Sequence, residues 1–199
     1  MTISLIVEGK TERAFIPTLR SFLESRLPGK MPRLDLFSQD GRIPKGDKLR
    51  RVVTTLLAGG ADAVIALTDV YTGTPEFKDG NDAKAQMRNW VGPLPQFFPH
   101  AAQHDFEAWL LPYWPDIQKL AGHKRSRPQG SPEGVNHNKP PSRHIQELFR
   151  IGTCRRDYVK ARDASRILEG KDLALAANEC SELKAMLNTI LSLCGGTTL

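Results

Sequence analysis

Acidic residues follow or end three short apolar segments of this sequence. Glu8 follows the first segment, Asp69 ends the second, and Asp105 and Glu107 follow the third. If these segments are neighbouring parallel strands, their carboxylates gather at one edge of the sheet. Hard cations such as Mg²⁺ and Mn²⁺ prefer oxygen ligands and keep waters that a phosphate can displace. The sequence therefore predicts a divalent-cation site made of Glu8, Asp69, Glu107 and Asp105.

These apolar segments belong to a longer alternation of strand-like and helix-like patterns. Apolar, often β-branched runs predict strands at 3–7, 34–37, 61–68 and 97–103. Helical spacing or helix-favouring composition predicts helices at 11–26, 47–57 and 79–90, and a further helix that opens at 106–111. Such alternation predicts an α/β fold over residues 1–121, with a parallel sheet of about four strands and helices on both faces. Ligands of open parallel sheets bind beyond the carboxyl ends of the strands, where the acidic residues stand.

The composition changes sharply after residue 121. Residues 122–143 are rich in Pro, Gly, Asn and His and carry several basic side chains. A loop of that length is usually either functional or disordered. Helical patterns follow at 142–149, 157–168, 173–177 and 181–193. We expect residues 144–199 to form a helical C-terminal subdomain that packs on the α/β core.

Composition and charge limit the class of protein. Hydrophobic residues make up 40% of the 199 residues and charged residues 25%, which are ordinary globular values. No apolar run of about 18 residues occurs, and the N-terminus lacks a signal-peptide pattern, so we expect a cytoplasmic protein with no membrane contact. The cysteines, Cys154, Cys180 and Cys194, are too far apart for a zinc or redox motif. A net charge of +6 favours a polyanionic partner such as nucleic acid.

The turn after the first strand reads VEGKTE, at residues 7–12. Gly9 allows a tight turn, Glu8 stands at the strand tip, and Glu12 lies on the first helical turn. No GxxxxGK motif occurs in the sequence, which argues against a Walker-type nucleotide site. The alternative is that Glu8 and Glu12 only oppose the helix dipole, an effect of about 0.3–1 kcal/mol each.

Three segments together resemble a known family: VEGKTE, VIALTD (64–69) and HDFEAWLL (104–111). They resemble the topoisomerase-primase (Toprim) domain, and more closely its branch in overcoming-lysogenization-defect (OLD) nucleases and the DUF4276 family. The resemblance implies that Glu8, Asp69 and Glu107 match conserved acidic residues of a Mg²⁺- or Mn²⁺-dependent nuclease. It also implies a role in bacterial anti-phage defence, with a separate ABC-type ATPase as a candidate partner. Lys160, in YVKARDASRIL, resembles a lysine that OLD-type nucleases place near the site.

One position departs from the Toprim pattern. These domains usually carry DxD at the second motif, whereas this chain has Asp69, Val70 and Tyr71. Glu76, Asp79 or Asp105 could supply the missing oxygen, or a single metal ion could suffice. The departure also leaves open a degenerate site that binds nucleic acid without cutting it.

The expected roles follow from the charge that builds on a phosphodiester during attack by water. Glu8, Asp69 and Glu107 would hold the metal, and Lys160 would neutralise the phosphoryl oxygens. His104 or Glu12 could shuttle the proton, since the pKa of a histidine lies near neutrality. The alternatives are that His104 is an ordinary residue at a strand end and that Lys160 is a solvated helix residue.

Basic residues along the chain could track a nucleic-acid backbone, although a run of charge is often only a solvated face. The candidates are Lys10, Lys124, Arg125, Arg127, Lys139, Arg143, Arg155, Arg156 and Arg162. Among the aromatic residues, Phe106 and Trp109 recur at helical spacing and are expected in the core, while Tyr113 and Trp114 are expected at a rim where they could stack on bases.

Three functional classes thus remain. The first is a metal-dependent endonuclease acting on DNA or RNA, and the second is a latent or non-catalytic nucleic-acid-binding partner of a separate ATPase. The third is a small-molecule phosphatase on the same sheet topology, against which the long basic loop argues. A homo-oligomer is compatible with each class.

Overall fold

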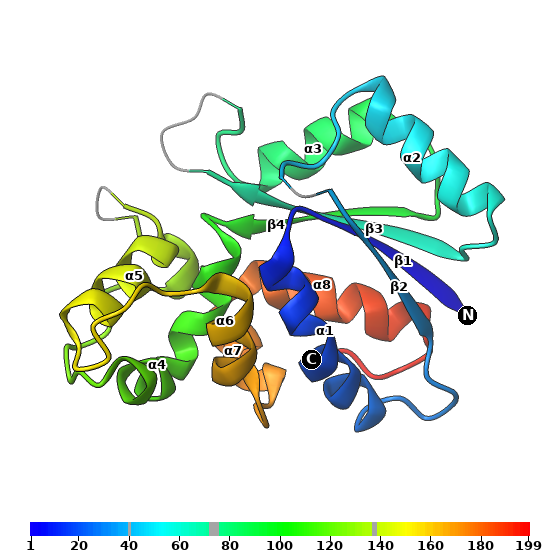
Figure 1. Cartoon of the computed structure of the whole chain (residues 1–199). Coiled ribbons are helices and arrows are strands. Elements are labelled where there is room, and N and C mark those ends of the chain that lie inside the picture. The colour runs from blue at the N-terminus through cyan, green and yellow to red at the C-terminus, as the bar shows by residue number, and fades with distance from the viewer. Residues whose placement is uncertain (40, 72–75, 137–138) are drawn as a thin grey trace.

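A computed structural model of the chain describes residues 1–39, 41–71, 76–136 and 139–199, and for Lys10 the backbone alone. Its centre is a four-stranded parallel sheet in the order β2-β1-β3-β4 (Figure 1). The strands are β1 (Thr2–Val7), β2 (Arg33–Ser38), β3 (Ala63–Val70) and β4 (Phe97–Gln103). The predicted α/β fold with a parallel sheet of four strands is confirmed.

Helices cover both faces of the sheet, as the alternation predicted. The crossovers are α1 (Lys10–Glu24), α2 (Asp47–Ala58) and α3 (Gly80–Val91). In Figure 1, α2 and α3 lie on one face, and α1 lies on the other beside the C-terminal helix α8 (Ser181–Leu193). The chain places β2 next to one edge of β1 and later returns to place β3 next to the other edge of β1. Such a change of direction opens a crevice between the carboxyl ends of β1 and β3.

The C-terminal part of the chain is helical within its described residues. Its elements are the 3₁₀ helix η1 (Phe106–Tyr113), α4 (Trp114–Ala121), the 3₁₀ turn η2 (Pro132–Gly134), α5 (Pro141–Ile151), α6 (Lys160–Leu168), α7 (Leu173–Glu179) and α8. The helix expected to open at 106–111 is thus a 3₁₀ helix instead of an α-helix. Pro112 and Pro115 each lack the backbone donor that one continuous α-helix would need.

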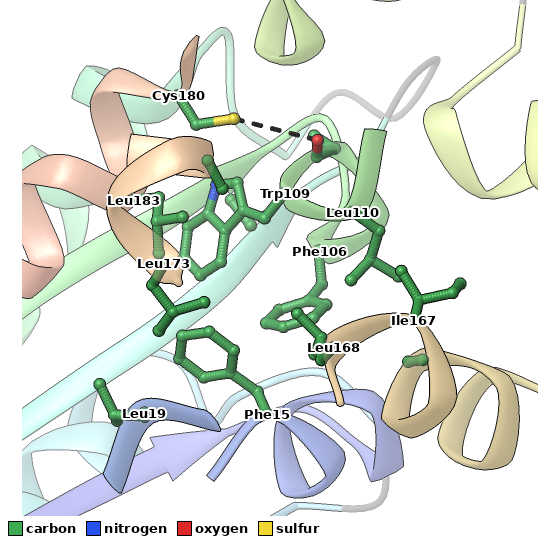
Figure 2. Packing of buried hydrophobic residues seen from close by; sticks show 14 of the residues in the cluster. Phe15, Leu19, Phe106, Trp109, Leu110, Ile167, Leu168, Leu173, Cys180 and Leu183 are labelled. Atoms are coloured by element: carbon green, nitrogen blue, oxygen red, sulfur yellow. Dashed lines mark hydrogen bonds between the residues drawn. The ribbon is translucent and has the colours of Figure 1, made fainter. Parts of the chain in front are cut away.

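One large apolar cluster joins the α/β core to these helices. Figure 2 shows Phe15 of α1 facing Phe106 and Trp109 of η1, with Leu173 of α7 beside them. The rings of Phe15 and Phe106 meet edge to face, with centroids 5.5 Å apart. The Cys180 thiol, at the start of α8, donates to the Ala108 carbonyl at 3.9 Å. Because η1 packs against β4 and several C-terminal helices, its carboxylate, Glu107, stays at the end of the sheet.

Two aromatic residues lie elsewhere than predicted. Tyr113 and Trp114 are buried, with exposures of 4% and 5%, so the prediction of rim residues is wrong. Tyr113 donates to the carbonyl of Asp172 at 2.9 Å, and Trp114 donates to that of Arg125 at 2.8 Å. The C-terminal helices cover both rings, and their polar atoms find backbone partners there. Phe106 and Trp109 are core residues, as expected.

The described residues contain no helix that is both long enough and apolar enough to cross a bilayer.

Candidate metal and phosphate site

The acidic residues of the sequence analysis meet beyond the carboxyl ends of β1 and β3. Glu8 follows β1, Asp69 lies near the end of β3, and Glu12 lies on the first turn of α1. A cavity of about 350 Å³ opens here. It is lined by Glu8, Gly9, Thr11, Glu12, Gly41, Asp69, Tyr71, Phe106, Val159, Lys160 and Ala161. Strand, helix and tail residues far apart in the sequence therefore share one pocket.

Glu8 is held by three donors from β3 and the residue that follows it. Its Oε1 accepts from the Thr68 hydroxyl at 2.6 Å and from the Asp69 backbone N–H at 3.1 Å. Its Oε2 accepts from the Tyr71 hydroxyl at 2.5 Å. These bonds lower the pKa of Glu8, but burial outweighs them and raises the pKa above its ordinary value. The position of Glu8 is thus fixed before any ligand binds.

Asp105 and Glu107 have buried carboxylate oxygens without a donor. Asp105 Oδ2 accepts from the Ser142 N–H at 3.1 Å, and Glu107 Oε2 accepts from Lys160 Nζ at 3.1 Å. Within the described part of the chain, the other oxygen of each side chain is buried and makes no hydrogen bond of good geometry, although the Tyr158 hydroxyl lies close to Glu107. Glu107 is fully buried and Asp105 is 3% exposed. Buried oxygens that lack a donor are costly, and a cation or a proton would satisfy them.

Burial raises the pKa of each carboxylic acid in the group, and repulsion between members of the group adds to the rise for Glu12, Asp69 and Glu107. The pKa of Glu12 rises to about 7, chiefly through burial and then through Glu107 and Glu8. The pKa of Glu107 also rises to about 7, through burial and then Asp105. Burial and the neighbouring carboxylates raise the pKa of Asp69 well above its ordinary value. These carboxylates therefore lie close enough to disfavour full ionisation without a counter-charge.

Lys160 supplies part of that counter-charge from the first turn of α6. Its Nζ lies 3.1 Å from Glu107 Oε2, while about half of its side chain is open to solvent. Burial lowers the pKa of Lys160, but Glu107, Asp105 and Asp69 raise it above its ordinary value. The ammonium group therefore stays charged at neutral pH and faces both the carboxylates and the solvent.

The other candidates for acid–base or ligand roles lie in different surroundings. His104 does not line the cavity, and burial lowers its pKa. Glu76 pairs with Arg42 and Lys45. Asp79 caps α3 by accepting from the Asp82 N–H at 2.8 Å. None of the three residues considered as a substitute for the second aspartate of DxD lines the cavity, but only Asp105 has a buried oxygen without a partner in the described part of the chain and is close enough to raise the pKa of Asp69. Asp105 is therefore the best placed of the three.

The carboxylates have the donor atoms that a hard divalent cation prefers, but they are not already arranged around one metal position. Across the described residues, no group of three or more His, Cys, Asp or Glu side chains is already positioned to hold a metal ion. The donor set nevertheless consists of carboxylate oxygens, and two of these, on Asp105 and Glu107, are buried without a partner. Oxygen-only donors suit Mg²⁺ and Mn²⁺.

A family model described as "Domain of unknown function (DUF4276)" matches residues 7–191, nearly the whole length of the chain. The chain belongs to the DUF4276 family. No curated protein matches this DUF4276 chain.

Two solved structures resemble the DUF4276 chain in fold. The C-terminal region of the Burkholderia pseudomallei OLD protein is 14% identical, with a TM-score of 0.51 and coverage of 96% of this chain and 98% of that one. The C-terminal region of the Xanthomonas campestris pv. campestris OLD protein is 15% identical, with a TM-score of 0.53 and coverage of 97% and 95%. At this level of identity the likeness establishes a shared Toprim-like fold, which agrees with the motifs in the sequence.

The basic residues predicted to bind nucleic acid fall into two groups in the DUF4276 chain. Several are already paired with carboxylates: Arg125 and Lys139 with Glu147, Arg127 with Glu179, and Arg156 and Arg162 with Asp163. Lys124, Arg143 and Arg155 are exposed. The side chain of Lys10 lies outside the described residues. None of the other side chains in these two groups lines the carboxylate cavity.

Sequence reasoning missed the residues that hold this site in place. Tyr71 and Thr68 fix Glu8, and their signal is only that they flank Asp69 in the sequence. Asp163, whose side chain is fully buried, accepts from Arg156 at 2.6 and 2.9 Å and from the Val159 N–H at 2.8 Å. Burial alone would raise the pKa of Asp163, but these donors and Arg162 lower it to about 2. The ion pair of Arg156 with Asp163 anchors the turn that precedes Lys160.

Replacing Arg156 with Ala is expected to lower the free energy of unfolding by about 2 kcal/mol, because the charge of Asp163 loses a two-point partner. Thermal or urea denaturation would measure the change. Arg150→Ala is the matched control, since Arg150 pairs with Asp157 at the surface, where both side chains are more than half exposed. That variant should change stability by about 0.5 kcal/mol or less. Equal effects of the two substitutions would mean that the buried pair does not anchor the turn.

Proposed function

We propose that this protein is a divalent-metal-dependent nuclease that hydrolyses phosphodiesters and acts in bacterial defence against phage. The observation that carries the proposal is the pair of buried, unpartnered carboxylate oxygens on Asp105 and Glu107, beside Lys160 at the crevice of a parallel sheet. A hard cation satisfies such oxygens, and a lysine next to it attracts a phosphate. The Toprim-like fold, whose members typically bind divalent metals, supports this interpretation.

The geometry also favours an anionic substrate. The helices α1 and α6 both begin at the cavity, where Gly9 and Val159 cap them without a side-chain hydrogen bond to the first turn. The free N–H groups and the dipole of a helix N-terminus attract phosphate. Two helix ends and the Lys160 ammonium therefore offset the repulsion that the carboxylates would exert on a phosphodiester.

Each residue would then have a distinct role in hydrolysis. Asp69, Asp105 and Glu107 would hold the cation, with Glu8 completing the set if its bond to Tyr71 breaks. The chemistry that a bound divalent cation supplies is stabilisation of charge on the phosphoryl oxygens and activation of water. Lys160 would bind a non-bridging oxygen of the phosphate.

Glu12 is the better of the two candidates for moving the proton. It lines the cavity, and its pKa of about 7 suits a general base at neutral pH. His104, the other candidate, lies outside the cavity lining. Glu12 would therefore accept the proton of the attacking water.

The test is incubation of the purified protein with labelled single- and double-stranded DNA and RNA, in Mg²⁺, Mn²⁺ or EDTA. The proposal expects cleavage with either cation and none in EDTA, and a generic phosphate ester should stay intact. Hydrolysis of the ester with no action on nucleic acid would favour a phosphatase and contradict the proposal.

A second candidate is a latent Toprim-like subunit that binds nucleic acid and cuts only with a separate ABC-type ATPase. Two observations favour it: Glu8 is committed to three protein donors, and no metal-ready group of ligands exists among the described residues. A partner could rearrange both features. Cleavage that appears only when the candidate ATPase and ATP are added would separate the latent subunit from the autonomous enzyme.

A further inference from the structure

A second, larger cavity lies between α1 and α6, the two helices that begin at the carboxylate pocket. Its volume is about 650 Å³. Residues from the middle and end of α1 line one wall, including Ala14, Pro17 and Ser21, and Ser165 and Glu169 line the opposite wall. The two helices pack against each other and lie side by side in Figure 1. We call this cavity, together with the exposed sides of α1 and α6 above it, the α1/α6 groove.

The groove and the carboxylate pocket lie along the same two helices. The pocket is lined by the first residues of both helices, Thr11 and Glu12 on α1 and Lys160 and Ala161 on α6, and the larger cavity by later residues of the same helices. Both helices begin at the pocket and run toward the larger cavity, so α1 and α6 point in the same general direction. A ligand that extends out of the pocket can therefore follow the line between the two helices.

Exposed arginines stand along both upper edges of the groove. On α1, Arg13 and Arg20 lie about 80–100° around the helix from the lining residues Ala14 and Ser21, on the side opposite the buried face. On α6, Arg166 stands in the same relation to the lining residue Ser165. Among the described residues, no carboxylate forms an ion pair with these three arginines, unlike many basic residues of the loop at 122–143.

The two walls of the groove carry hydroxyl groups that can donate to phosphate. Ser21 and Ser165 are exposed and line opposite walls. The charge changes at the far end, where Glu169 and Asp172 line the cavity and the basic residues Arg26 and Lys171 pair with Asp172 and Asp116. In the described part of the chain, the stretch with unpaired arginines and hydroxyl groups therefore runs from Lys160 to about the level of Arg20, roughly 10 Å along α1 from Arg13 at 1.5 Å per residue.

We propose that the α1/α6 groove binds the backbone of a single nucleic-acid strand and leads it into the carboxylate pocket. The axes of packed helices lie only about 8–10 Å apart, so the groove along their contact has room for one extended backbone. The two backbones of a duplex lie on either side of a major groove roughly 12 Å wide, so a duplex could place only one of them in the groove. The inference rests on the proposed function, because it assigns the form of the substrate of that same pocket.

The test measures binding of a fluorescein-labelled single-stranded oligonucleotide in EDTA, by anisotropy at several salt concentrations. EDTA removes any contribution of a cation at the carboxylates, so the readout is independent of cleavage. The Arg13→Ala/Arg20→Ala variant should bind several-fold more weakly, and its plot of log affinity against log salt should be shallower by about 1.4, or about 0.7 for each lost phosphate contact. Arg166→Ala should make the plot shallower by about 0.7.

Arg50→Ala/Arg51→Ala is the matched control, since these exposed arginines lie on α2, on the opposite face of the sheet. Its affinity and salt dependence should equal those of the wild type. Ser165→Trp adds a second test without a change of charge, because the indole fills the groove and should also weaken binding. Circular dichroism of each variant checks that it is folded.

Several results would overturn the groove as the strand path. These are no binding by the wild type, equal losses in groove and control variants, or tighter binding of a duplex than of a single strand. A different result would contradict the proposed function. A wild-type protein that binds a single strand in the groove but never cuts it would contradict the nuclease and support the groove as a binding site. Conversely, normal cutting and binding by the groove variants would support the nuclease and contradict the groove as the path of the strand.

Discussion

Replacing Asp69 with Asn is expected to lower Mn²⁺-dependent cleavage of nucleic acid by at least about 10³-fold. The substitution keeps the shape of the side chain and removes the charge that would face the cation. Loss of several kcal/mol of transition-state stabilisation corresponds to a factor of this size. Asp69 lies near the end of β3 and is 6% exposed, among Glu8, Glu12 and Glu107. Initial rates on a labelled oligonucleotide at saturating Mn²⁺ would measure the effect.

The same variant should be as stable as the wild type in EDTA, or more stable. Without a cation the carboxylates repel one another, and removing one of them relieves that repulsion. Asp35→Asn is the matched control, because Asp35 lies on the edge strand β2 and pairs with the exposed Arg33. It should cut at the wild-type rate. Normal cutting by Asp69→Asn would remove Asp69 from the site, and unfolding of that variant would make Asp69 a structural residue.

The metal-free protein is expected to lose stability as the pH rises from about 5 to 7.5. The pKa values of Glu12 and Glu107 rise from 4.5 to about 7 on folding. Between these values the folded state binds more protons than the unfolded chain, so the free energy of unfolding falls with increasing pH. Each group contributes up to about 3 kcal/mol, which is lost above pH 7. The lowered pKa of Asp163 acts below its ordinary value of 3.8, outside this range. Burial lowers the pKa of His100 from 6.5 to about 4, so His100 acts in the opposite direction up to about pH 6.5 and offsets part of the loss.

Differential scanning fluorimetry in EDTA would show this as a melting temperature about 5–10 °C lower at pH 7.5 than at pH 5. Glu12→Gln cannot ionise and should flatten part of the dependence, whereas Glu24→Gln, an exposed position of the same helix, should not. Mn²⁺ should raise the melting temperature more at pH 7.5 than at pH 5, because protons compete with the cation for the same oxygens. A melting temperature that rises with pH in EDTA would contradict the buried, repelling carboxylates.

The fold was predictable because its signals are local. The apolar runs at β1 and β3 and the alternation with amphipathic helices determine a parallel sheet, and the strand ends then determine where Glu8 and Asp69 lie. The convergence of Glu107 on the same place depends on η1, whose prolines favoured a 3₁₀ helix that the helical spacing did not reveal. Lys160 was expected from the resemblance to OLD-type nucleases, and the structure brings its Nζ within 3.1 Å of Glu107. The roles of these residues stay predictions.

The remaining features depend on contacts between distant segments. Tyr71 reaches Glu8 across the crevice, and that hydrogen bond depends on side-chain directions that no sequence period encodes. The burial of Trp114 depends on where the C-terminal part of the chain packs. The same packing makes α6 the neighbour of α1, which forms the groove with Arg20 and Arg166 on its edges. The sequence alone favoured the basic residues of the loop at 122–143 as part of the nucleic-acid-binding surface.

The most direct test of the central claim is a crystal soaked in Mn²⁺, with data collected at the manganese absorption edge. The claim is that the carboxylates of Asp69, Asp105 and Glu107 together hold a divalent cation. It predicts an anomalous peak in the cavity beyond β1 and β3, about 2–2.5 Å from oxygens of at least two of these side chains. An empty cavity at millimolar Mn²⁺, with the Asp105 and Glu107 oxygens bonded to waters or to protein donors, would contradict it.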